Sequence, residues 1–336
     1  MDLYLKKIKD RQNLTQAEIE DVMRAIMSGQ AREDQISEFL LALNEKGPTI
    51  DEITGAAKLL RQVSLSVKTR HPVVLDTCGT GGDQKGSFNI STIVAFVVAG
   101  AGVVVAKHGN RSVSSRVGSA DLLEALGVNL NIEEKHLSEC LDDIGIAFLF
   151  AQKLHPAMKQ VAPVRKALKV KTIFNILGPL INPAGATHQV MGVYSRDLVE
   201  PLAHVLKNLG LRRALVVHGS DGLDEFTTTG PTFIGEFDGQ RIVTYDVDPS
   251  ELGIAQAREE DLRGGDLAMN VQIAKDIFAG QKGPRRDIVL LNAAYALYLS
   301  EKVRNISDGL QVAAHAIDSG KAREKLDALR KKTQCP

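Results

Sequence analysis

The sequence has little cysteine, no excess of charge of either sign and no long hydrophobic run. Its three cysteines, Cys78, Cys140 and Cys335, are too few and too scattered for a disulfide framework or a zinc site. Lys plus Arg and Asp plus Glu both number 41, and this net charge of zero argues against bulk binding to nucleic acid or to a membrane surface. The sparse cysteine fits a reducing cytoplasm.

Membrane insertion and secretion also find no support in the sequence. The longest apolar stretch, around 93–106, is too short to span a bilayer. The first residues, MDLYLKKIKDRQ, lack the apolar core of a signal peptide. We therefore expect a cytoplasmic protein with no membrane and no nucleic-acid partner. A length of 336 residues, with 44% hydrophobic and 24% charged residues, favours a sizeable core in two domains.

The first seventy residues carry helix patterns only. Capping-box patterns at Thr15–Glu18 and Thr49–Glu52 each predict the start of a helix. Between them, residues at about 34–44 place apolar side chains at helical spacing. We therefore expect a small all-helical domain over 1–70. Its apolar faces exceed what one small bundle can bury, which predicts a homodimer formed through this part.

From His71 onward, short β-branched runs alternate with longer helical patterns. Strands are expected at 73–76, 103–106, 213–217 and 242–245, and helices at 92–101, 119–126, 198–209, 286–299 and 309–319. Alternation of this kind predicts an α/β fold in which helices flank a mostly parallel central sheet.

The segment 162–183 interrupts this alternation. A predicted helix with a basic face (Arg165, Lys166, Lys169 and Lys171) precedes the pairs Gly178-Pro179 and Asn182-Pro183, which are typical of turns or of a crossing between domains. We therefore assign about 165–185 to the small helical domain. The α/β domain then comprises 71–164 and 186–336, and Arg70–Pro72 is the other expected crossing.

The stretch VVLDTCGTGGDQKGSFNIST, residues 73–92, predicts an anion site. A predicted strand leads into the glycine-dense turn Cys78–Asp83, and a helix opens near Asn89. Glycine permits positive φ and a close approach of ligand, and the free N–H groups of a helix start attract anions. The expected ligand is a phosphate or a diphosphate. Taken alone, the pattern could equally be a tight strand-to-helix connection.

Two further clusters follow predicted strands and should lie at the same edge of the sheet. Residues 107–115 supply cations, an amide and hydroxyls, which suit several phosphate oxygens. After the strand at 213–217 come Asp221, Asp224 and Glu225, which would repel one another unless a cation such as Mg²⁺ neutralised them. The alternatives are a solvated polar loop and an acidic surface turn, and the second competes seriously for Asp221.

Taken together, these motifs resemble the anthranilate phosphoribosyltransferase family. The matching segments are 76–92, 107–126 (KHGNRSVSSRVGSADLLEAL), 155–165, 172–184 (TIFNILGPLINPA) and 221–225. The resemblance extends from the helical start to the last helix. It implies transfer of a phosphoribosyl group from phosphoribosyl diphosphate (PRPP) to the amine of anthranilate in tryptophan biosynthesis. It also implies Mg²⁺ as cofactor, with two ions per subunit.

The resemblance assigns roles to individual residues. The positions that match the family's PRPP contacts are Gly79, Gly82, Asp83, Ser87, Asn89, Ile90, Ser91, Thr92, Lys107, His108, Gly109, Asn110, Arg111, Ser112, Val113, Ser114, Ser115 and Ser119. Those that match its anthranilate contacts are Gly79, Asn110 and Arg165, and those that match its Mg²⁺ ligands are Ser91, Asp224 and Glu225. No dedicated acid or base is expected, because an aromatic amine is weakly basic. His108 is either a helper or a structural residue.

Two other functions stay open at this stage. A pyrimidine-nucleoside phosphorylase shares the fold and has a Lys-His-containing phosphate loop. The adjacent carboxylates Asp224 and Glu225 disfavour it, because a phosphorylase binds phosphate without needing Mg²⁺. A nucleic-acid-binding relative of the fold would need a strongly basic surface, which the net charge of zero disfavours.

Overall fold

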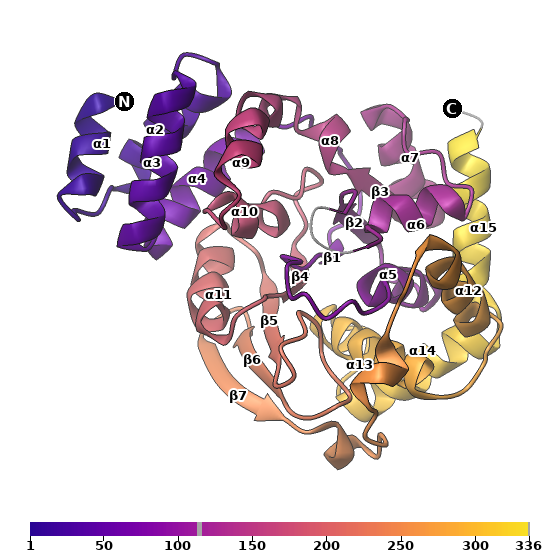
Figure 1. Cartoon of the computed structure of the whole chain (residues 1–336). Coiled ribbons are helices and arrows are strands. Elements are labelled where there is room, and N and C mark those ends of the chain that lie inside the picture. Colours follow the sequence, from indigo (N-terminus) through magenta and orange to yellow (C-terminus); the bar gives the residue numbers. More distant parts are fainter. Residues whose placement is uncertain (113–115, 335–336) are drawn as a thin grey trace.

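The computed structural model describes residues 1–112 and 116–334 and places a helical region beside a larger α/β region (Figure 1). The helical region begins with α1 (Asp2–Lys9), α2 (Gln16–Met27), α3 (Glu33–Lys46) and α4 (Ile50–Gln62). The three predicted helices of this part are confirmed, and α1 is an additional one. No helix in the two described ranges is long and apolar enough to cross a membrane.

Both predicted capping boxes form, and one of them connects two helices. The Thr15 side chain accepts a hydrogen bond from the Glu18 amide, and the Glu18 carboxylate accepts one from the Thr15 amide. Thr49 and Glu52 repeat this arrangement at the start of α4. The Glu52 carboxylate, which is 0% exposed, also accepts a hydrogen bond from the Leu14 amide at 2.9 Å. One buried carboxylate therefore joins α4 to the segment that leads into α2.

A seven-stranded sheet forms the centre of the α/β region, in the order β3-β2-β1-β4-β5-β6-β7. The strands are β1 (Leu75–Thr77), β2 (Val105–Gly109), β3 (Ile146–Phe150), β4 (His188–Gly192), β5 (Arg213–Gly219), β6 (Thr232–Phe237) and β7 (Ile242–Val247). Pairings from β3 through β5 are parallel, whereas β6 is antiparallel to both β5 and β7. The predicted α/β fold is confirmed, although β3, β4 and β6 were not predicted.

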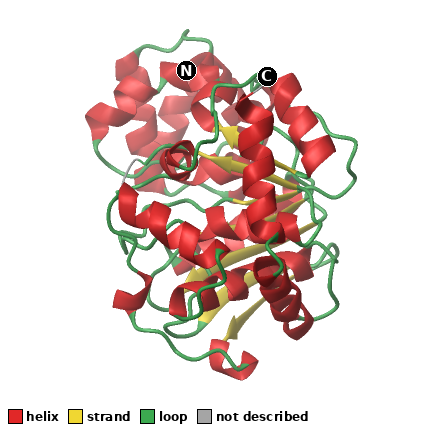
Figure 2. Cartoon of the chain, turned by 90° about the vertical axis from the view of Figure 1, so that its right-hand side faces the viewer, coloured by secondary structure: helices red, strands yellow, loops and turns green. Residues whose placement is uncertain are grey.

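Helices cover both faces of the sheet (Figure 2). Those of the α/β region are α5 (Ile90–Gly100), α6 (Ser119–Ala125), α7 (Glu134–Ile144), α8 (Ala151–Leu154), α11 (Val199–Asn208), α12 (Leu267–Phe278), α13 (Pro284–Leu299), α14 (Ile306–Asp318) and α15 (Lys321–Gln334). The side chains of β5 alternate between two hydrophobic cores, because successive side chains of a strand point to opposite faces of the sheet. Leu215 and Val217 join the core that contains α5, whereas Ala214 and Val216 join the core of the helical region.

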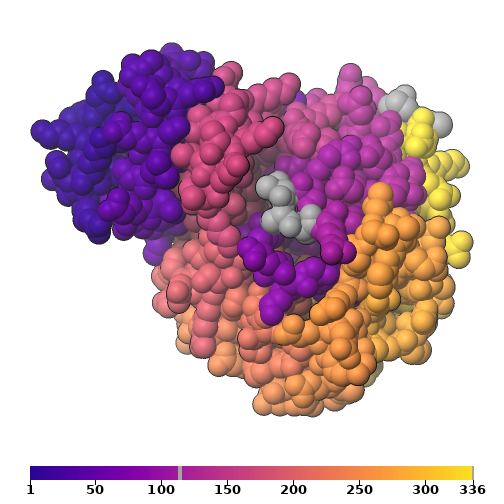
Figure 3. Space-filling view, viewed as in Figure 1, coloured from indigo at the N-terminus to yellow at the C-terminus, as the bar shows by residue number. Residues whose placement is uncertain are grey.

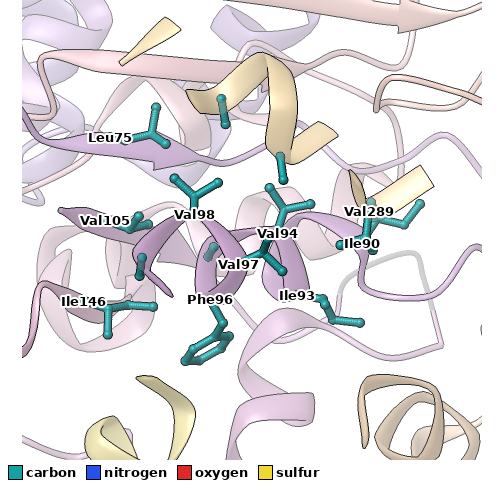
Figure 4. Close-up of a cluster of buried hydrophobic side chains, with 14 of the residues drawn as sticks. Leu75, Ile90, Ile93, Val94, Phe96, Val97, Val98, Val105, Ile146 and Val289 are labelled. Carbon is teal, nitrogen blue, oxygen red and sulfur yellow. The ribbon is translucent and has the colours of Figure 1, made fainter. Parts of the chain in front are cut away.

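The burial of helix α5 fixes the position of its N-terminus, the end that the sequence predicts to face an anion. It is apolar on nearly every side, and Figure 4 shows its side chains among those of Leu75 (β1), Val105 (β2) and Ile146 (β3). A helix that is hydrophobic all round is stable only when it is buried. Its packing against β1, β2 and β3 fixes the N-terminus of α5 beside the turn that follows β1.

The predicted basic helix is shorter than expected. Helix α9 (Ala162–Leu168) holds Arg165, but Lys169 ends it in the left-handed conformation, with a φ of 53°. This conformation usually belongs to glycine, because a Cβ strains it. Lys171 therefore lies beyond the helix, and Arg165 and Lys171 do not share a helical face.

One of the two pairs predicted to turn the chain does so: at Asn182-Pro183 the Gly185 amide donates to the Asn182 carbonyl at 3.3 Å. The pair Gly178-Pro179 lies inside α10 (Phe174–Leu180), whose apolar side chains are buried in the core of the helical region. This burial outweighs the helix-breaking tendency of the pair. At the other crossing, the amide and the guanidinium of Arg70 both donate to oxygen atoms of Asp142 in α7. Packing of α10 thus fixes the connection at Gly178-Pro179, and hydrogen bonds to Asp142 fix the one at Arg70.

Candidate active site

The predicted loops meet at the carboxyl edge of the sheet. The glycine turn (residues 78–83) follows β1, and the acidic loop (residues 220–225) follows β5. Between them lies a cavity of about 10 Å³, the size that roughly one water needs. Its lining residues are Thr77, Gly79, Ser91, Val94, Val190, Gly192, Glu225 and Asn292. The structure therefore brings the glycine turn, the start of α5 and the acidic loop to the edge where open α/β sheets bind ligands.

Close backbone contacts join the glycine turn to the acidic loop. The Gly81 amide donates to Oδ2 of Asp224 at 2.7 Å, and a Cβ on Gly79 would lie 2.8 Å from the same oxygen. A Cβ on Gly192, at the end of β4, would lie 1.5 Å from the carbonyl oxygen of Asp224. Gly81 and Gly82 have φ values of 64° and 79°. Glycine is therefore required where the turn, β4 and the acidic loop touch.

The carboxylates of Asp83, Asp224 and Glu225 form an acidic group beside the start of α5, where Oε1 of Glu225 accepts a hydrogen bond from the Ser91 amide at 3.2 Å. Burial and the charges of Asp83 and Glu225 raise the pKa of Asp224 well above its ordinary value. Burial also raises the pKa of Glu225 to about 7, against the charge of Lys107. Carboxylates under this repulsion gain stability from a nearby cation.

The donor set of the acidic group fits Mg²⁺. Oδ2 of Asp83 is buried beside the Asp224 carboxylate and, within the described part of the chain, accepts no hydrogen bond from an N–H group or a hydroxyl. Leaving such an oxygen unpaired is costly, and Mg²⁺ prefers hard oxygen ligands. In residues 1–112 and 116–334, no group of three or more His, Cys, Asp or Glu is spaced to hold a metal ion by itself. The fit is therefore to an ion that a few carboxylate oxygens share with water and phosphate oxygens.

Asp221, the other predicted carboxylate, is a structural residue of its own loop. Its Oδ2 accepts hydrogen bonds from the hydroxyls of Thr227 at 2.8 Å and Thr229 at 2.7 Å. Its Oδ1 accepts one from the Leu223 amide at 3.0 Å. These bonds satisfy both oxygens, so the alternative of a structural acidic turn holds for Asp221. Asp83 takes its place in the acidic group.

Lys107 brings a positive charge into the site. Its side chain is 4% exposed and donates to the Thr77 carbonyl at 2.6 Å and to Oγ of Ser91 at 3.3 Å. Burial raises the pKa of Asp76 to about 6, and the charge of Lys107 opposes this shift. The ammonium is thus fixed between β1 and α5, where it acts on Asp76 and on the acidic group.

His108, the candidate helper, is enclosed by protein. Its ring is 2% exposed, with Nδ1 3.1 Å from the Gly178 carbonyl oxygen and Nε2 3.1 Å from Nε2 of His155. A carbonyl oxygen only accepts, so Nδ1 of His108 carries the proton and its Nε2 accepts from His155. Both nitrogens are engaged, and this geometry favours a structural role over proton transfer.

These buried histidines predict a loss of stability in mild acid. Burial lowers the pKa of His155 and of His188 to about 4, and that of His108 well below its ordinary value. The unfolded chain therefore binds more protons than the folded one between pH about 6.5 and 4. Each histidine therefore lowers the free energy of unfolding by roughly 1.4 kcal/mol per pH unit as the pH falls through this range, whereas Asp76, Asp224 and Glu225, whose pKa values are raised, act in the opposite sense. Urea unfolding of the parent chain and of His188→Gln at pH 7 and pH 5 isolates the contribution of one histidine. The parent should lose more stability than the variant between the two pH values, and equal changes in both chains would contradict the prediction.

The loop after β2 is partly outside the described residues. The predicted PRPP-binding positions that lie outside them are Val113, Ser114 and Ser115. Asn110 is exposed at the start of the loop, and its carbonyl accepts hydrogen bonds from the Ser119 hydroxyl at 3.3 Å and the Ala120 amide at 3.2 Å. A Cβ on Gly109 would lie 2.3 Å from Oγ of Ser119. The start of α6 thus packs closely against the end of β2.

Arg111 faces carboxylates of its own chain. Its guanidinium makes ion pairs with Asp121 at 2.8 Å and with Glu124 at 2.9 Å, both in α6. The Ser112 amide donates to the same Asp121 at 3.2 Å. Arg111 also lines a groove of about 700 Å³ that Phe150 and other residues share. Its side chain therefore holds the loop against α6 in this structure, which the sequence pattern did not indicate.

The first residues of α5 are mostly enclosed by protein. Ile90 and Thr92 are 1% and 2% exposed. Nδ2 of Asn89 donates to the Val117 carbonyl at 3.1 Å, while its Oδ1 is buried without a partner among the described residues. Ser87 forms an isolated bridge with Arg263. The Ile90 amide donates to the Phe88 carbonyl at 2.7 Å and the Ser91 amide to Glu225 at 3.2 Å, so both amides are engaged, whereas the Ser91 side chain is partly exposed.

Arg165 is half-buried and lies 5.5 Å from the ring centroid of Phe174. Within 1–112 and 116–334 it makes no ion pair with a carboxylate. Burial lowers the pKa of this guanidinium, as expected for a charge without a counterion. Lys171, which the sequence pattern places on a basic helix face, instead contacts the glycine turn by donating to the Gly82 carbonyl at 3.3 Å.

Comparisons with known proteins agree with this geometry. Residues 3–64 match the helical bundle domain of a glycosyl transferase family, and residues 71–323 match the a/b domain of that family. The anthranilate phosphoribosyltransferase of Symbiobacterium thermophilum is 49% identical over 333 residues, covering 99% of this chain and 98% of the relative. That of Pelotomaculum thermopropionicum is 52% identical over 325 residues, covering 97% and 94%.

Two solved structures share the whole fold. The crystal structure of anthranilate phosphoribosyltransferase from Thermus thermophilus has a TM-score of 0.94 and 40% identity, covering 98% of this chain and 99% of that one. The enzyme from Saccharomyces cerevisiae in complex with PRPP and Mg has a TM-score of 0.92 and 28% identity, covering 99% and 97%. With these relatives and the converged loops described above, this chain belongs to the anthranilate phosphoribosyltransferase family.

Proposed function

We propose that this chain transfers the phosphoribosyl group of PRPP to anthranilate, as in tryptophan biosynthesis. A bond forms between the amine nitrogen and the anomeric carbon, the bond from that carbon to diphosphate breaks, and the amine loses a proton. One observation carries the proposal. Asp224 and Glu225 lie against backbone donors, the Gly81 amide at 2.7 Å and the Ser91 amide at 3.2 Å. These bonds hold the carboxylate oxygens at the glycine turn and the start of α5, where a Mg²⁺–diphosphate group would find hard oxygen ligands.

PRPP would bind along the carboxyl edge of the sheet. Amides of the glycine turn and of the start of α5 would hold phosphate oxygens, and Lys107 would place its charge near the departing diphosphate. The proposed PRPP contacts among the described residues are Gly79, Gly82, Asp83, Ser87, Asn89, Ile90, Ser91, Thr92, Lys107, His108, Gly109, Asn110, Arg111, Ser112 and Ser119. His108 is enclosed and Arg111 is ion-paired, so both would contribute through backbone groups or by holding the loop.

Ser91, Asp224 and Glu225 would hold Mg²⁺, and we propose two ions per subunit. Bound Mg²⁺ neutralises the charge that develops on the departing diphosphate. The buried, unpaired Oδ2 of Asp83 supports a second ion in the same acidic group. The relative from Saccharomyces cerevisiae, solved with PRPP and Mg, supports the use of this cofactor.

Anthranilate would bind between α9 and the glycine turn. The half-buried Arg165, which has no carboxylate partner in the described ranges, would form two parallel hydrogen bonds with the substrate carboxylate. The Asn110 amide would bind a polar group on the ring, and Gly79 would allow close approach. No dedicated base is needed, because the aromatic amine is unprotonated at neutral pH. The remaining task of the protein is to hold the amine in line with the anomeric carbon.

Anthranilate fluorescence provides the direct test. Incubation with PRPP and Mg²⁺ should deplete the fluorescence of anthranilate, and omission of PRPP should prevent this. A parallel incubation with a pyrimidine nucleoside and inorganic phosphate tests the phosphorylase alternative and should release no base. Stable anthranilate fluorescence together with release of the pyrimidine base would reject the proposed function and support the phosphorylase.

We also propose a cytoplasmic homodimer with the two domains assigned above. Helices α1–α4 share a core with α10 and α11, which covers much of their apolar surface, yet Leu3 and Leu41 remain 69% and 45% exposed. Burial of these side chains between two copies is the reason to expect a symmetric dimer. Cys78 and Cys140 are free thiols, which supports a reducing compartment. Sedimentation at micromolar concentration should give the mass of two chains, and a single-chain mass would refute the dimer.

A further inference from the structure

Lys171 links two parts of the site that belong to different segments of the chain. Its Nζ donates to the Gly82 carbonyl at 3.3 Å and lies 3.4 Å from the ring centroid of Tyr194. In the space-filling view, the pink surface of the segment after α9 lies next to the purple surface of the glycine turn (Figure 3). One side chain therefore connects the segment that carries Arg165 to the turn proposed to bind diphosphate.

Tyr194 is itself bound to the same turn. Its amide donates to Oγ1 of Thr80 at 3.1 Å, and the Thr80 amide donates to the Gly192 carbonyl at 2.9 Å. The ring that contacts the Lys171 ammonium is therefore held by the turn. A cation over an aromatic face adds attraction to the hydrogen bond with Gly82. The Lys171 ammonium thus contacts two groups, the Gly82 carbonyl and the Tyr194 ring, and both are attached to the glycine turn.

The backbone just before Lys171 is strained at Lys169. Lys169 adopts a φ of 53° where glycine is usual, and this turn of the chain follows directly after α9. A strained residue persists only where its surroundings compensate for the strain. The two contacts of Lys171, two residues further on, provide such compensation. The position of α9 and the position of the turn are therefore linked through residues 169–171.

We propose that Lys171 is a positioning residue that couples binding at the glycine turn to binding of the anthranilate carboxylate at Arg165. This proposal rests on the proposed function. A diphosphate at the turn adds negative charge close to the ammonium and holds Lys171 in place, which orders the end of α9 and orients Arg165. Because coupling between two sites is reciprocal, anthranilate should strengthen diphosphate binding by the same factor.

The experiment measures anthranilate affinity by its fluorescence, with and without inorganic diphosphate and Mg²⁺. Diphosphate is the probe because it cannot react with anthranilate. In the parent chain it should strengthen anthranilate binding about fivefold to tenfold, the low end of the range for coupling between two sites, because Lys171 is exposed. In Lys171→Met this factor should fall to about one. Lys166→Met, which removes an exposed charge from α9 itself, should keep the parent factor.

A second pair of variants separates coupling from folding. Tyr194→Phe keeps the ring beneath the ammonium and should keep the coupling, whereas Tyr194→Leu should reduce it. Equal factors in the parent and in Lys171→Met, or no effect of diphosphate in the parent, would overturn the coupling. Phosphoribosyl transfer by the parent chain is measured in parallel. An active parent with unchanged coupling in Lys171→Met rejects only the role of Lys171, whereas an inactive parent rejects the proposed function.

Discussion

Replacing Asp224 by Asn together with Glu225 by Gln should reduce Mg²⁺-dependent phosphoribosyl transfer by about a thousandfold or more. Both side chains lie beside the turn and the helix start proposed to bind diphosphate, with Asp224 on the Gly81 amide and Glu225 on the Ser91 amide. Amide side chains keep the shape and an acceptor oxygen but remove the negative charge that holds a divalent cation. Initial rates at saturating PRPP, anthranilate and Mg²⁺ measure the loss.

The same double variant should fold at least as well as the parent. Burial and the charge of Asp83 raise the pKa of Asp224 and the pKa of Glu225, and Glu225 adds to the shift at Asp224, so removal of both charges relieves an unfavourable interaction. Thermal unfolding followed by circular dichroism checks this point. Glu200→Gln removes an exposed carboxylate from α11 and should change neither rate nor stability. Full activity of the double variant would reject the metal role, and loss of folding would assign the pair a structural one.

The glycine turn was predictable because its constraints are local. A β-branched run, a cluster of glycines and a helix start stand next to one another in the sequence, and positive φ at Gly81 and Gly82 follows from that pattern. The need for glycine at Gly192 could not be foreseen. It arises because the Asp224 carbonyl approaches from the acidic loop after the neighbouring strand β5, a contact that only the sheet order creates.

Charged residues were harder to assign than glycines. The sequence grouped Asp221 with Asp224 and Glu225 because they are neighbours in the chain, yet the side chain of Asp221 bonds to threonines of its own loop. Asp83, from the turn after β1, completes the acidic group instead. The partner of a charged side chain depends on which loops the fold brings together. Sequence spacing indicates only the contacts between residues that are neighbours in the chain.

Strand prediction failed where the usual signals were weak. β4 begins with His188 and Gln189, both 1% exposed, and polar residues of this kind seldom indicate a buried strand. The Gln189 side chain is satisfied by the Pro179 carbonyl at 2.7 Å, a partner in α10. Tertiary hydrogen bonds thus permit a polar strand at the centre of the sheet, which local propensity does not anticipate.

Arg165→Ala should weaken anthranilate binding by about tenfold to a hundredfold while leaving PRPP binding nearly unchanged. Losing one charge-assisted contact costs about 1.5–3 kcal/mol, which corresponds to this range. The guanidinium is half-buried against Phe174 and, among residues 1–112 and 116–334, has no carboxylate partner that would compete for it. The KM for each substrate, measured by fluorescence depletion, separates the two effects.

Two further variants decide whether Arg165 acts through its charge or through its shape. Arg165→Lys keeps the charge but loses the planar pair of donors that matches a carboxylate, so it should recover only part of the lost affinity. Lys166→Ala, an exposed neighbour in α9, should bind anthranilate as the parent does. Equal weakening of PRPP and anthranilate in Arg165→Ala would mean that α9 positions both substrates. Weakening of anthranilate alone, with partial recovery in Arg165→Lys, requires a carboxylate held directly by this guanidinium.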